Sequence, residues 1–508
     1  MNWANFAEFF ISSISLYGSR NALYWRKNGN RGSISGNDSF EKLYDSISGN
    51  KLKELVYHLS RTIEGWNLKP GDKAVIISES RFEWVVADFA CIMNRIETIP
   101  IYTTMTSSQM KYILEHSGAK ICFTSTRLIT DKIKAVFDEL PDLTKVISFN
   151  NLGSEHDYVI NFEDLIYSSL IHAKESYDEK EAEEYFKECS SKISGNDILT
   201  IIYTSGTTGT PKGVCLTHRN ILSNVDMCQK AFHISSKDRI LSFLPLAHCY
   251  ERTTGYYFAM SVGAEIYYGE NIDTLASQFT EVKPTLVTAV PILFNRVYSK
   301  IIKSVQAYPA RKRMLVNYAF KLAMKSGTDR NSTLWKFFDK LVYKKIRERT
   351  GGEIDIFISG GSALNPEINR FFNGIGLNVY EGYGLTEASP VIAVNRPKAN
   401  RIGTVGLLLD GIEPRIADDG EILIRGENVM KGYYKGEDET RNTIIDGWLH
   451  TGDIGEIDNE GFLKITDRKK TLIKTAGGKY ISLTHVEETI ETSDYVSQII
   501  CFAGDDKP

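Results

Sequence analysis

The sequence lacks the features of secreted, membrane-spanning and nucleic-acid-binding proteins. Its seven cysteines, an odd number, include no C-x-x-C pair, so they indicate reduced core residues of a cytosolic enzyme rather than a disulfide or metal framework. No apolar run approaches the ~18 residues that a membrane-spanning helix needs. The net charge of −4 favours no nucleic-acid partner.

The amino terminus also lacks a secretory signal. Residues 1–17 place Phe6, Phe10 and Ile14 at helical spacing, but they have neither the basic start nor the unbroken apolar core of a signal peptide. We therefore expect a cytoplasmic protein.

The chain is long enough for several layered units. Its 508 residues exceed the ~150 residues of a typical domain, so more than one core is expected. Short β-rich runs alternate with helical runs over about residues 73–149 and 193–377, which predicts α/β layers. After about residue 401, short β runs separated by Gly/Asp turns predict a small all-β region. The charged stretch 174–192 is interpreted as a solvated connector.

A loop rich in hydroxyl groups and glycine follows the predicted strand Leu199–Tyr203. Glycines let backbone N–H groups converge on an anion, Ser/Thr hydroxyls add donors, and a lysine supplies positive charge. The lysine lies between Pro211 and Gly213, so the Walker A spacing is not met. The alternative is a surface hairpin. The predicted phosphate-binding residues are Thr204, Ser205, Gly206, Thr207, Thr208, Gly209 and Lys212.

This loop resembles the phosphate loop of the acyl-adenylate-forming superfamily, which contains acyl-CoA synthetases, luciferases and peptide-synthetase adenylation domains. Further segments follow in the order and approximate spacing of that family, so that the resemblance covers nearly the entire chain. These segments are 244–252, 358–364, 380–387, 448–453 and 467–481.

The resemblance implies an α/β fold with a large amino-terminal domain, a hinge and a small carboxy-terminal domain. The large domain would contain two layered α/β subdomains and a β-barrel-like subdomain, and the small α+β domain would be incomplete. The expected ranges are 1–466 for the large domain (1–192, 193–377 and 378–466), 467–470 for the hinge and 471–508 for the partial domain.

The same resemblance implies which residues bind ATP and AMP. Tyr383 would stack on adenine, and Asp453 would hold the ribose hydroxyls, a role that suits the two acceptor oxygens of a carboxylate. Arg468 would lie near the ribose and phosphates. The remaining implied contacts are Gly361, Ser362 and Ala363, which would pack against adenine, together with Glu381 and Gly382.

Catalytic, metal and coenzyme A contacts are implied in the same way. Thr386 would contact the α-phosphate, and Glu387 would ligate Mg²⁺ together with the Thr204 hydroxyl, since Mg²⁺ prefers few protein oxygens plus phosphate oxygens. His248 would line the acyl pocket, and its segment lacks the aspartate that holds an amino-acid substrate. The implied catalytic set is Lys212, His248, Thr386, Glu387 and the hinge residue Lys470, and the implied coenzyme A contacts are Lys474, Gly477 and Gly478.

These motifs resemble the long-chain fatty acid–CoA ligases, so the expected reaction consumes a fatty acid, ATP with Mg²⁺, and coenzyme A. Its products would be acyl-CoA, AMP and pyrophosphate. Two alternatives stay open: a ligase that transfers the acyl group to a carrier protein, and a catalytically silent acyl- or nucleotide-binding protein. The oligomeric state is open as well, with a homodimer among the alternatives.

A basic segment lies between Lys300 and Arg349, with fourteen Lys/Arg against three Asp/Glu and several aromatic residues at helical spacing. One interpretation is peripheral contact of residues 300–349 with anionic lipid. The other is a solvated helical hairpin whose aromatic side chains pack on the body of the protein.

Only 38 residues, Thr471–Pro508, follow the expected hinge. So small a piece cannot close its own core. The family resemblance implies roughly a hundred residues there, with a lysine near the terminus that assists adenylation. We therefore expect a truncated form that binds ATP and AMP but adenylates fatty acid more slowly than an extended chain.

Overall fold

A computed structural model describes most of the chain up to residue 469 and isolated segments beyond it. The described residues are 3–27, 43–153, 156–166, 177–204, 210–271, 273–326, 330–469, 472–474, 480–483, 486–487, 490, 496 and 499–501. Among them, no helix combines the length and the apolar character that crossing a bilayer requires.

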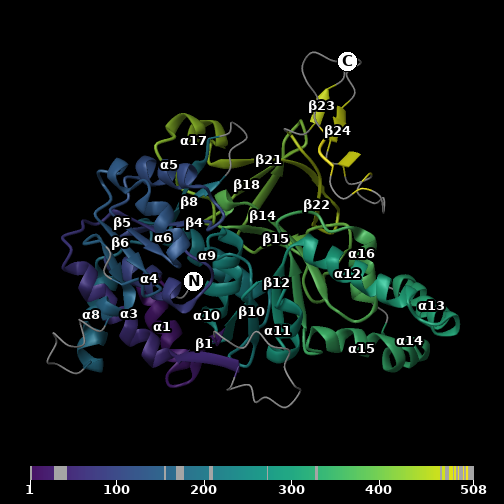
Figure 1. Cartoon of the computed structure of the whole chain (residues 1–508). Helices are drawn as coiled ribbons and strands as arrows, with labels where there is room; N and C mark the ends of the chain where they lie inside the picture. The colour runs from purple at the N-terminus through teal and green to yellow at the C-terminus, as the bar shows by residue number, and fades with distance from the viewer. Residues whose placement is uncertain are drawn as a thin grey trace.

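The first sheet has eight strands and lies in the purple and blue half of Figure 1. Six neighbouring strands, from β8 to β7 in the order of the sheet, run parallel to one another. Strands β9 and β19 are antiparallel and form one edge. The parallel strands are apolar on both faces because helices cover both sides. In sheet order the strands are β19 (Gly432–Tyr433), β9 (Lys212–Thr217), β8 (Ile198–Thr204), β4 (Glu97–Ile101), β3 (Lys73–Ile77), β5 (Ile121–Thr124), β6 (Lys145–Ser148) and β7 (Val159–Asn161).

The second sheet is larger and mixed. Strands β14 to β1 are parallel, and the β-rich carboxy-terminal region continues from β14 as antiparallel strands of the same sheet. In sheet order they are β17 (Glu413–Ile416), β18 (Glu421–Arg425), β21 (Trp448–Ile457), β22 (Phe462–Arg468), β16 (Gly406–Leu408), β15 (Val391–Val394), β14 (Val379–Gly384), β13 (Ile356–Ser359), β12 (Leu286–Ala289), β10 (Arg239–Ser242), β11 (Glu265–Tyr268), β1 (Asn21–Arg26) and β2 (Tyr44–Ser48), with β20 (Ile444–Ile445) beside β21.

The division of the chain between the two sheets does not follow residue 193, the expected subdomain boundary. Strands β1 and β2 join the second sheet, whereas β8 and β9, which flank the predicted phosphate loop, join the first. A separate two-stranded ribbon, β23 (Leu472–Lys474) and β24 (Tyr480–Ser482), follows residue 469.

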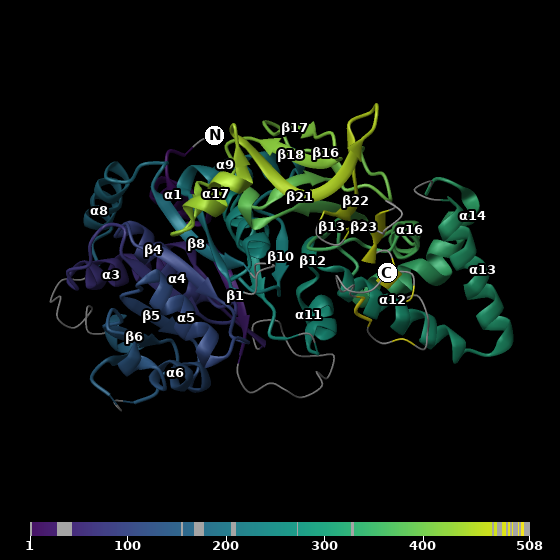
Figure 2. The ribbon, with the colours of Figure 1, turned by 90° about the horizontal axis from the view of Figure 1, so that it is seen from above.

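Helices cover the sheets and project from one side of the second (Figures 1 and 2). Helix α4 is mostly apolar, and all but its first residue is buried, including Glu83 and Asp88, as expected of a core helix whose charges have partners. The α-helices are α1 (Phe6–Tyr17), α3 (Gly49–Glu64), α4 (Phe82–Met93), α5 (Ser107–Ser117), α6 (Arg127–Lys134), α8 (Glu179–Ser191), α9 (His218–Ala231), α10 (Phe258–Ser261), α11 (Leu275–Val282), α12 (Pro291–Gln306), α13 (Ala310–Ser326), α14 (Thr333–Phe338), α15 (Lys344–Arg347), α16 (Pro366–Gly374) and α17 (Glu437–Thr443).

The prediction of a solvated connector over residues 174–192 was wrong for its described part. Helix α8 occupies Glu179–Ser191, and it buries Ala182, Phe186 and Cys189. These residues form a narrow apolar stripe at i, i+4 and i+7 that packs among α1, α3 and α4. The many Glu and Lys residues around the stripe hide this period in the sequence.

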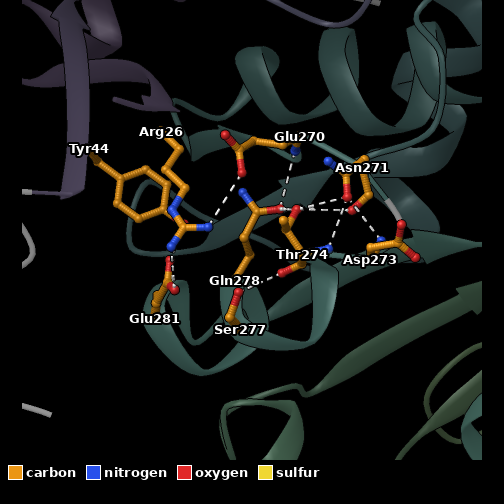
Figure 3. A network of polar contacts seen from close by, with 9 residues as sticks. All are labelled: Arg26, Tyr44, Glu270, Asn271, Asp273, Thr274, Ser277, Gln278 and Glu281. Atoms are coloured by element: carbon orange, nitrogen blue, oxygen red, sulfur yellow. Dashed lines mark hydrogen bonds and ion pairs between the residues drawn. The ribbon is translucent and has the colours of Figure 1, made fainter. Parts of the chain in front are cut away.

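A polar network fastens the edge of the second sheet to α11 (Figure 3). The Arg26 guanidinium lies 3.4 Å from the carboxylates of both Glu270 and Glu281, and the Tyr44 hydroxyl donates to Glu281 at 2.8 Å. Gln278 accepts the backbone N–H of Glu270 at 3.2 Å. Since Arg26 and Glu281 are almost fully buried, losing one partner would leave an uncompensated charge.

Candidate active site

The strands on either side of the predicted phosphate loop form an antiparallel pair. Thr204 ends β8 and lies opposite Lys212, the first residue of β9. The loop residues Ser205, Gly206, Thr207, Thr208 and Gly209 lie outside the described residues. The hairpin that would hold the loop is therefore present, with both predicted end residues at the carboxyl end of β8.

Lys212 and Glu387 both contact Tyr433. The Lys212 ammonium lies 5.5 Å from the centre of the Tyr433 ring, a cation–π contact. The Tyr433 hydroxyl donates to Glu387 Oε1 at 2.9 Å. Lys212 also lies 3.9 Å from Glu439. One tyrosine thus links the end of the phosphate hairpin to the Thr386–Glu387 turn.

The segment around Tyr433 is held by backbone hydrogen bonds on both sides. Met430 N–H donates to Glu387 O at 2.8 Å, and Lys431 N–H donates to Cys215 O on β9 at 3.0 Å. Tyr434 N–H donates to Gly213 O at 2.7 Å. Sequence reasoning missed Tyr433. The available signal was the Gly432-Tyr433-Tyr434 run, an aromatic pair in a polar stretch.

Three predicted nucleotide-binding residues meet on β14, β21 and β22. The Tyr383 hydroxyl donates to Asp453 Oδ2 at 2.7 Å, and Arg468 Nε lies 3.1 Å from Asp453 Oδ1. Burial raises the pKa of the Asp453 carboxyl, whereas Tyr383 and Arg468 counter that rise. A carboxylate offers about four acceptor positions, so Asp453 can still accept from two ribose hydroxyls.

The predicted adenine-facing segment follows β13 directly. Gly361 has φ +86°, and Gly361, Ser362 and Ala363 are exposed. A Cβ atom on the preceding Gly360 would lie 2.9 Å from the Tyr250 ring, so this position needs glycine for close packing.

Glu381 holds this segment in place rather than facing solvent. Its carboxylate accepts Leu364 N–H at 3.2 Å and Asn369 Nδ2–H at 2.7 Å, and burial raises its pKa. The next residue on β14, Gly382, pairs with Val394 on β15. Thr386 and Glu387 lie in a 3₁₀ turn directly after β14.

His248 precedes a π-helical segment, Glu251–Tyr257. Its side chain is exposed, its Nδ1 accepts Tyr250 N–H at 3.1 Å, and its ring lies edge-on to Tyr102 at 6.5 Å. The surrounding protein desolvates the imidazole and lowers its pKa. His248 is therefore neutral near pH 7 and accessible to a ligand.

Two charged neighbours of His248 are buried and had no role assigned from sequence. Glu251 accepts hydrogen bonds from Ser242 and Thr288 at 2.6 and 2.7 Å, and burial raises its pKa to about 7. Arg252 pairs with Asp88 at 2.5 Å. The signal was two adjacent charges within an apolar run, which require buried partners.

Arg252 joins four elements beneath the site. It donates to Thr98 on β4 at 2.8 Å, to Thr200 on β8 at 2.7 Å and to Tyr257 at 3.0 Å. Burial raises the pKa of Asp88, and the guanidinium and the Tyr257 hydroxyl counter that rise. The strand that leads to the phosphate loop is thereby fixed to the helix that follows His248.

Part of the predicted site lies outside the described residues. Lys470, Gly477 and Gly478 lie outside the described residues, and Lys474 lies in β23. Lys469, just before the predicted hinge residue, pairs with Asp419 at 2.6 Å and Glu421 at 3.0 Å. The hinge and coenzyme A contacts therefore stay predictions.

Sequence comparison places the chain among known ligases. The family model of the AMP-binding enzymes matches residues 25–434. The long-chain-fatty-acid–CoA ligase FadD15 of Mycobacterium bovis is 34% identical over 455 residues, which cover 87% of this chain and 72% of that protein. Long chain acyl-CoA synthetase 1 of Arabidopsis thaliana is 31% identical over 514 residues, covering 97% of this chain and 76% of that protein.

Solved structures confirm the α/β fold. The anthranilate CoA ligase AuaEII in complex with anthranoyl-AMP matches with a TM-score of 0.73 at 18% identity, over 98% of this chain and 83% of that one. ATP-bound MatB from Rhodopseudomonas palustris matches with a TM-score of 0.72 at 21% identity, over 97% and 84%. ATP binding is typical of the family that the sequence matches. The chain therefore belongs to the AMP-binding, adenylate-forming enzymes, within the acyl-CoA synthetase family of acid–thiol ligases.

Proposed function

We propose that this protein activates a long-chain fatty acid with ATP and transfers the acyl group to coenzyme A. The observation that carries the proposal is the convergence of Lys212 and Glu387 on Tyr433, and the Tyr383–Asp453–Arg468 cluster supports it. The fatty acid is supported by the names of the relatives and by the segment around His248, which has no aspartate to hold an amino group.

The first half-reaction forms an acyl-adenylate. A carboxylate oxygen attacks the α-phosphorus of ATP, the new oxygen–phosphorus bond forms, and the bond to the departing pyrophosphate breaks. Both reactants are anionic, so the Lys212 ammonium lowers their repulsion. Asp453 and Tyr383 would hold the nucleoside, and the exposed Gly361–Ala363 segment would accept the adenine.

Glu387 and Thr204 are the residues that would hold Mg²⁺. A carboxylate and a hydroxyl fit a hard cation that takes its other ligands from phosphate and water. When bound, the ion supplies charge neutralisation at the phosphates. Without the ion, the Glu387 carboxylate would repel the anionic phosphates. The Tyr433 hydroxyl is neutral and would not offset that repulsion.

The second half-reaction is a thioester synthesis. The thiol sulfur of coenzyme A attacks the acyl carbonyl, AMP leaves with the electrons of the carbon–oxygen bond, and the thiol proton passes to solvent or AMP. The neutral imidazole of His248 adds no charge beside an apolar chain. An exposed position at the start of a helical segment lets it line the acyl path without blocking it.

The test is ATP consumption with a long-chain saturated acid, assayed with coenzyme A, with acyl carrier protein and with neither. The proposal expects AMP and acyl-CoA with coenzyme A only. Product on the carrier protein alone would favour an acyl-AMP ligase that serves a carrier. ATP binding without turnover in any assay would favour a silent binding protein. A strict preference for acetate or an amino acid in competition would overturn the fatty-acid assignment.

A further inference from the structure

Helices α12 to α15 carry an unusual share of the exposed apolar surface. More than half of the large apolar side chains that are exposed in the described residues lie on them. Figures 1 and 2 both place α13 and α14 at the edge of the molecule, away from the first sheet. The exposed side chains are Ile292, Met314, Leu315, Tyr318, Leu334, Phe337 and Leu341.

On α13 the buried and exposed residues occupy opposite sides of the helix. Val316, Ala319, Phe320 and Ala323 face the core and are buried. Met314 is 74% exposed and Tyr318 is 56% exposed, and at a spacing of four they lie on one outward face. The same outward face carries Arg311, Lys321 and Lys325, which are exposed as well.

The helix formed by α14, the π segment Asp339–Tyr343 and α15 repeats this arrangement. Trp335, Phe338 and Tyr343 are buried, and the Trp335 indole donates to Gly374 O at 2.7 Å. Leu334, Phe337 and Leu341 are exposed at spacings of three and four, next to the exposed residues Lys340, Lys344 and Lys345.

Helix α13 packs against the helix formed by α14, the π segment and α15. The Tyr318 and Phe338 rings lie 5.7 Å apart, Phe337 packs against Phe338 at 5.3 Å, and the Tyr343 hydroxyl donates to Ala319 O at 2.6 Å. The aromatic residues of these helices thus divide into two groups. Some anchor the helices to the body, and others line an exposed basic and apolar surface, which we call the α13–α15 face.

Charge distinguishes the possible occupants of this face. Residues 300–349, which contain the face, carry fourteen Lys/Arg against three Asp/Glu, in a chain whose net charge is −4. Of the three acidic residues, Asp339 is paired with Arg347 at 2.6 Å. A second copy would bring like charges together, which is costly. A nucleic acid would satisfy the cations but not the apolar side chains.

We propose that the α13–α15 face docks on an anionic phospholipid bilayer. Met314, Tyr318, Phe337 and Leu341 would enter the boundary between headgroups and acyl chains, while long Lys and Arg side chains extend their charges to the phosphates. Each cation near an anionic surface strengthens such binding. The docking requires no enzymatic activity, so its test is independent of the function proposed above.

The experiment is co-sedimentation of the full chain with phosphatidylglycerol–phosphatidylcholine vesicles and with phosphatidylcholine vesicles. We expect binding to the anionic vesicles that weakens as salt rises. The charge variant Lys340→Glu/Lys344→Glu and the apolar variant Met314→Gln/Phe337→Gln should each lower the partition coefficient about tenfold or more. The matched control Lys187→Glu/Leu128→Gln changes exposed residues elsewhere and should bind like the wild type.

Tryptophan at position 337 gives a second readout. In Phe337→Trp, anionic vesicles should shift the added emission to shorter wavelength and protect it from an aqueous quencher. Equal binding to both vesicle types, no binding to either, or unchanged binding by both face variants would overturn the proposal. So would sedimentation velocity showing a dimer that the apolar variant abolishes, because a second copy would then cover the face.

Discussion

Two aspartate–arginine pairs, one beneath the candidate site and one within it, differ in their exposure to solvent. In the Asp88–Arg252 pair the side chains are 0% and 1% exposed. In the Asp453–Arg468 pair Asp453 is 7% exposed, but Arg468 is 71% exposed. The first pair is saturated by threonine and tyrosine hydroxyls, whereas the second leaves a guanidinium in solvent.

This difference separates the scaffold from the binding surface. A buried pair with full hydrogen bonding fixes geometry, and removing one partner is costly because the other charge stays buried. A half-exposed pair contributes little to stability, because solvent screens the interaction of its exposed member. The same contrast holds between Glu251, buried below His248, and Glu387, which is partly exposed.

The largest expected effect is the loss of the buried guanidinium. Arg252→Met should lower the free energy of unfolding by about 3–5 kcal/mol, because Asp88 would remain buried without its partner. Urea denaturation measures this. The matched variant Arg468→Met should change stability by less than about 1 kcal/mol while weakening ATP binding. Similar stability losses in the two variants would contradict the contrast between the pairs.

The second effect is a pH dependence carried by Glu251. Burial raises its pKa from 4.5 to about 7, so the folded state binds a proton that the unfolded state releases. Its contribution to stability is present below pH 4.5 and is lost as pH rises to about 7; the full change is about 3 kcal/mol. The difference in unfolding free energy between wild type and Glu251→Gln should follow this course. If the difference between wild type and variant did not change with pH, the buried Glu251 carboxyl would not be the source of the pH dependence.

The third effect concerns the exposed carboxylate. Glu387→Gln should reduce fatty-acid-dependent AMP formation at least about 100-fold, because the neutral amide cannot balance the charge of Mg²⁺ beside the phosphates. Stability should stay nearly unchanged, since Glu387 is partly exposed and has the Tyr433 hydroxyl as its side-chain partner. Near-normal turnover with Mg²⁺ would remove Glu387 from the proposed metal site.

The smallest effect is the loss of one hydroxyl. Tyr433→Phe keeps the ring beneath Lys212 but removes the donor to Glu387. We expect AMP formation to fall about tenfold, as for a hydrogen bond to a charged group, with a higher Mg²⁺ requirement. Tyr434→Phe is the matched control, because its hydroxyl contacts Ser117 O instead. Equal losses in both variants would indicate a packing effect.

Most strands and helices of the α/β layers were predictable because their periods are strong. Strand β6 and helix α4, for example, both lie in the stretch 73–149, where alternating β-rich and helical runs predicted an α/β layer. Helix α8 was missed because three apolar residues among many charges give a weak period. The assignment of β1 and β8 to different sheets was not predictable, because strand pairing between distant segments leaves no local pattern.

The structure brings Tyr383, Asp453 and Arg468 into contact, and their roles in binding a nucleotide stay predictions. Tyr433 was not found from the sequence. Its importance follows from two long-range contacts, with Lys212 and with Glu387, and a lone tyrosine carries no signal of either.

By itself the sequence determined the family, the α/β class and the residue types of the site, since these depend on local period and motif spacing. Only the tertiary structure decided which charges are buried within the fold and which lie at the surface. Arg252 and Arg468 are the same residue type in the sequence. Burial, which depends on segments brought together from across the chain, encloses Arg252 in the core and leaves Arg468 at the surface.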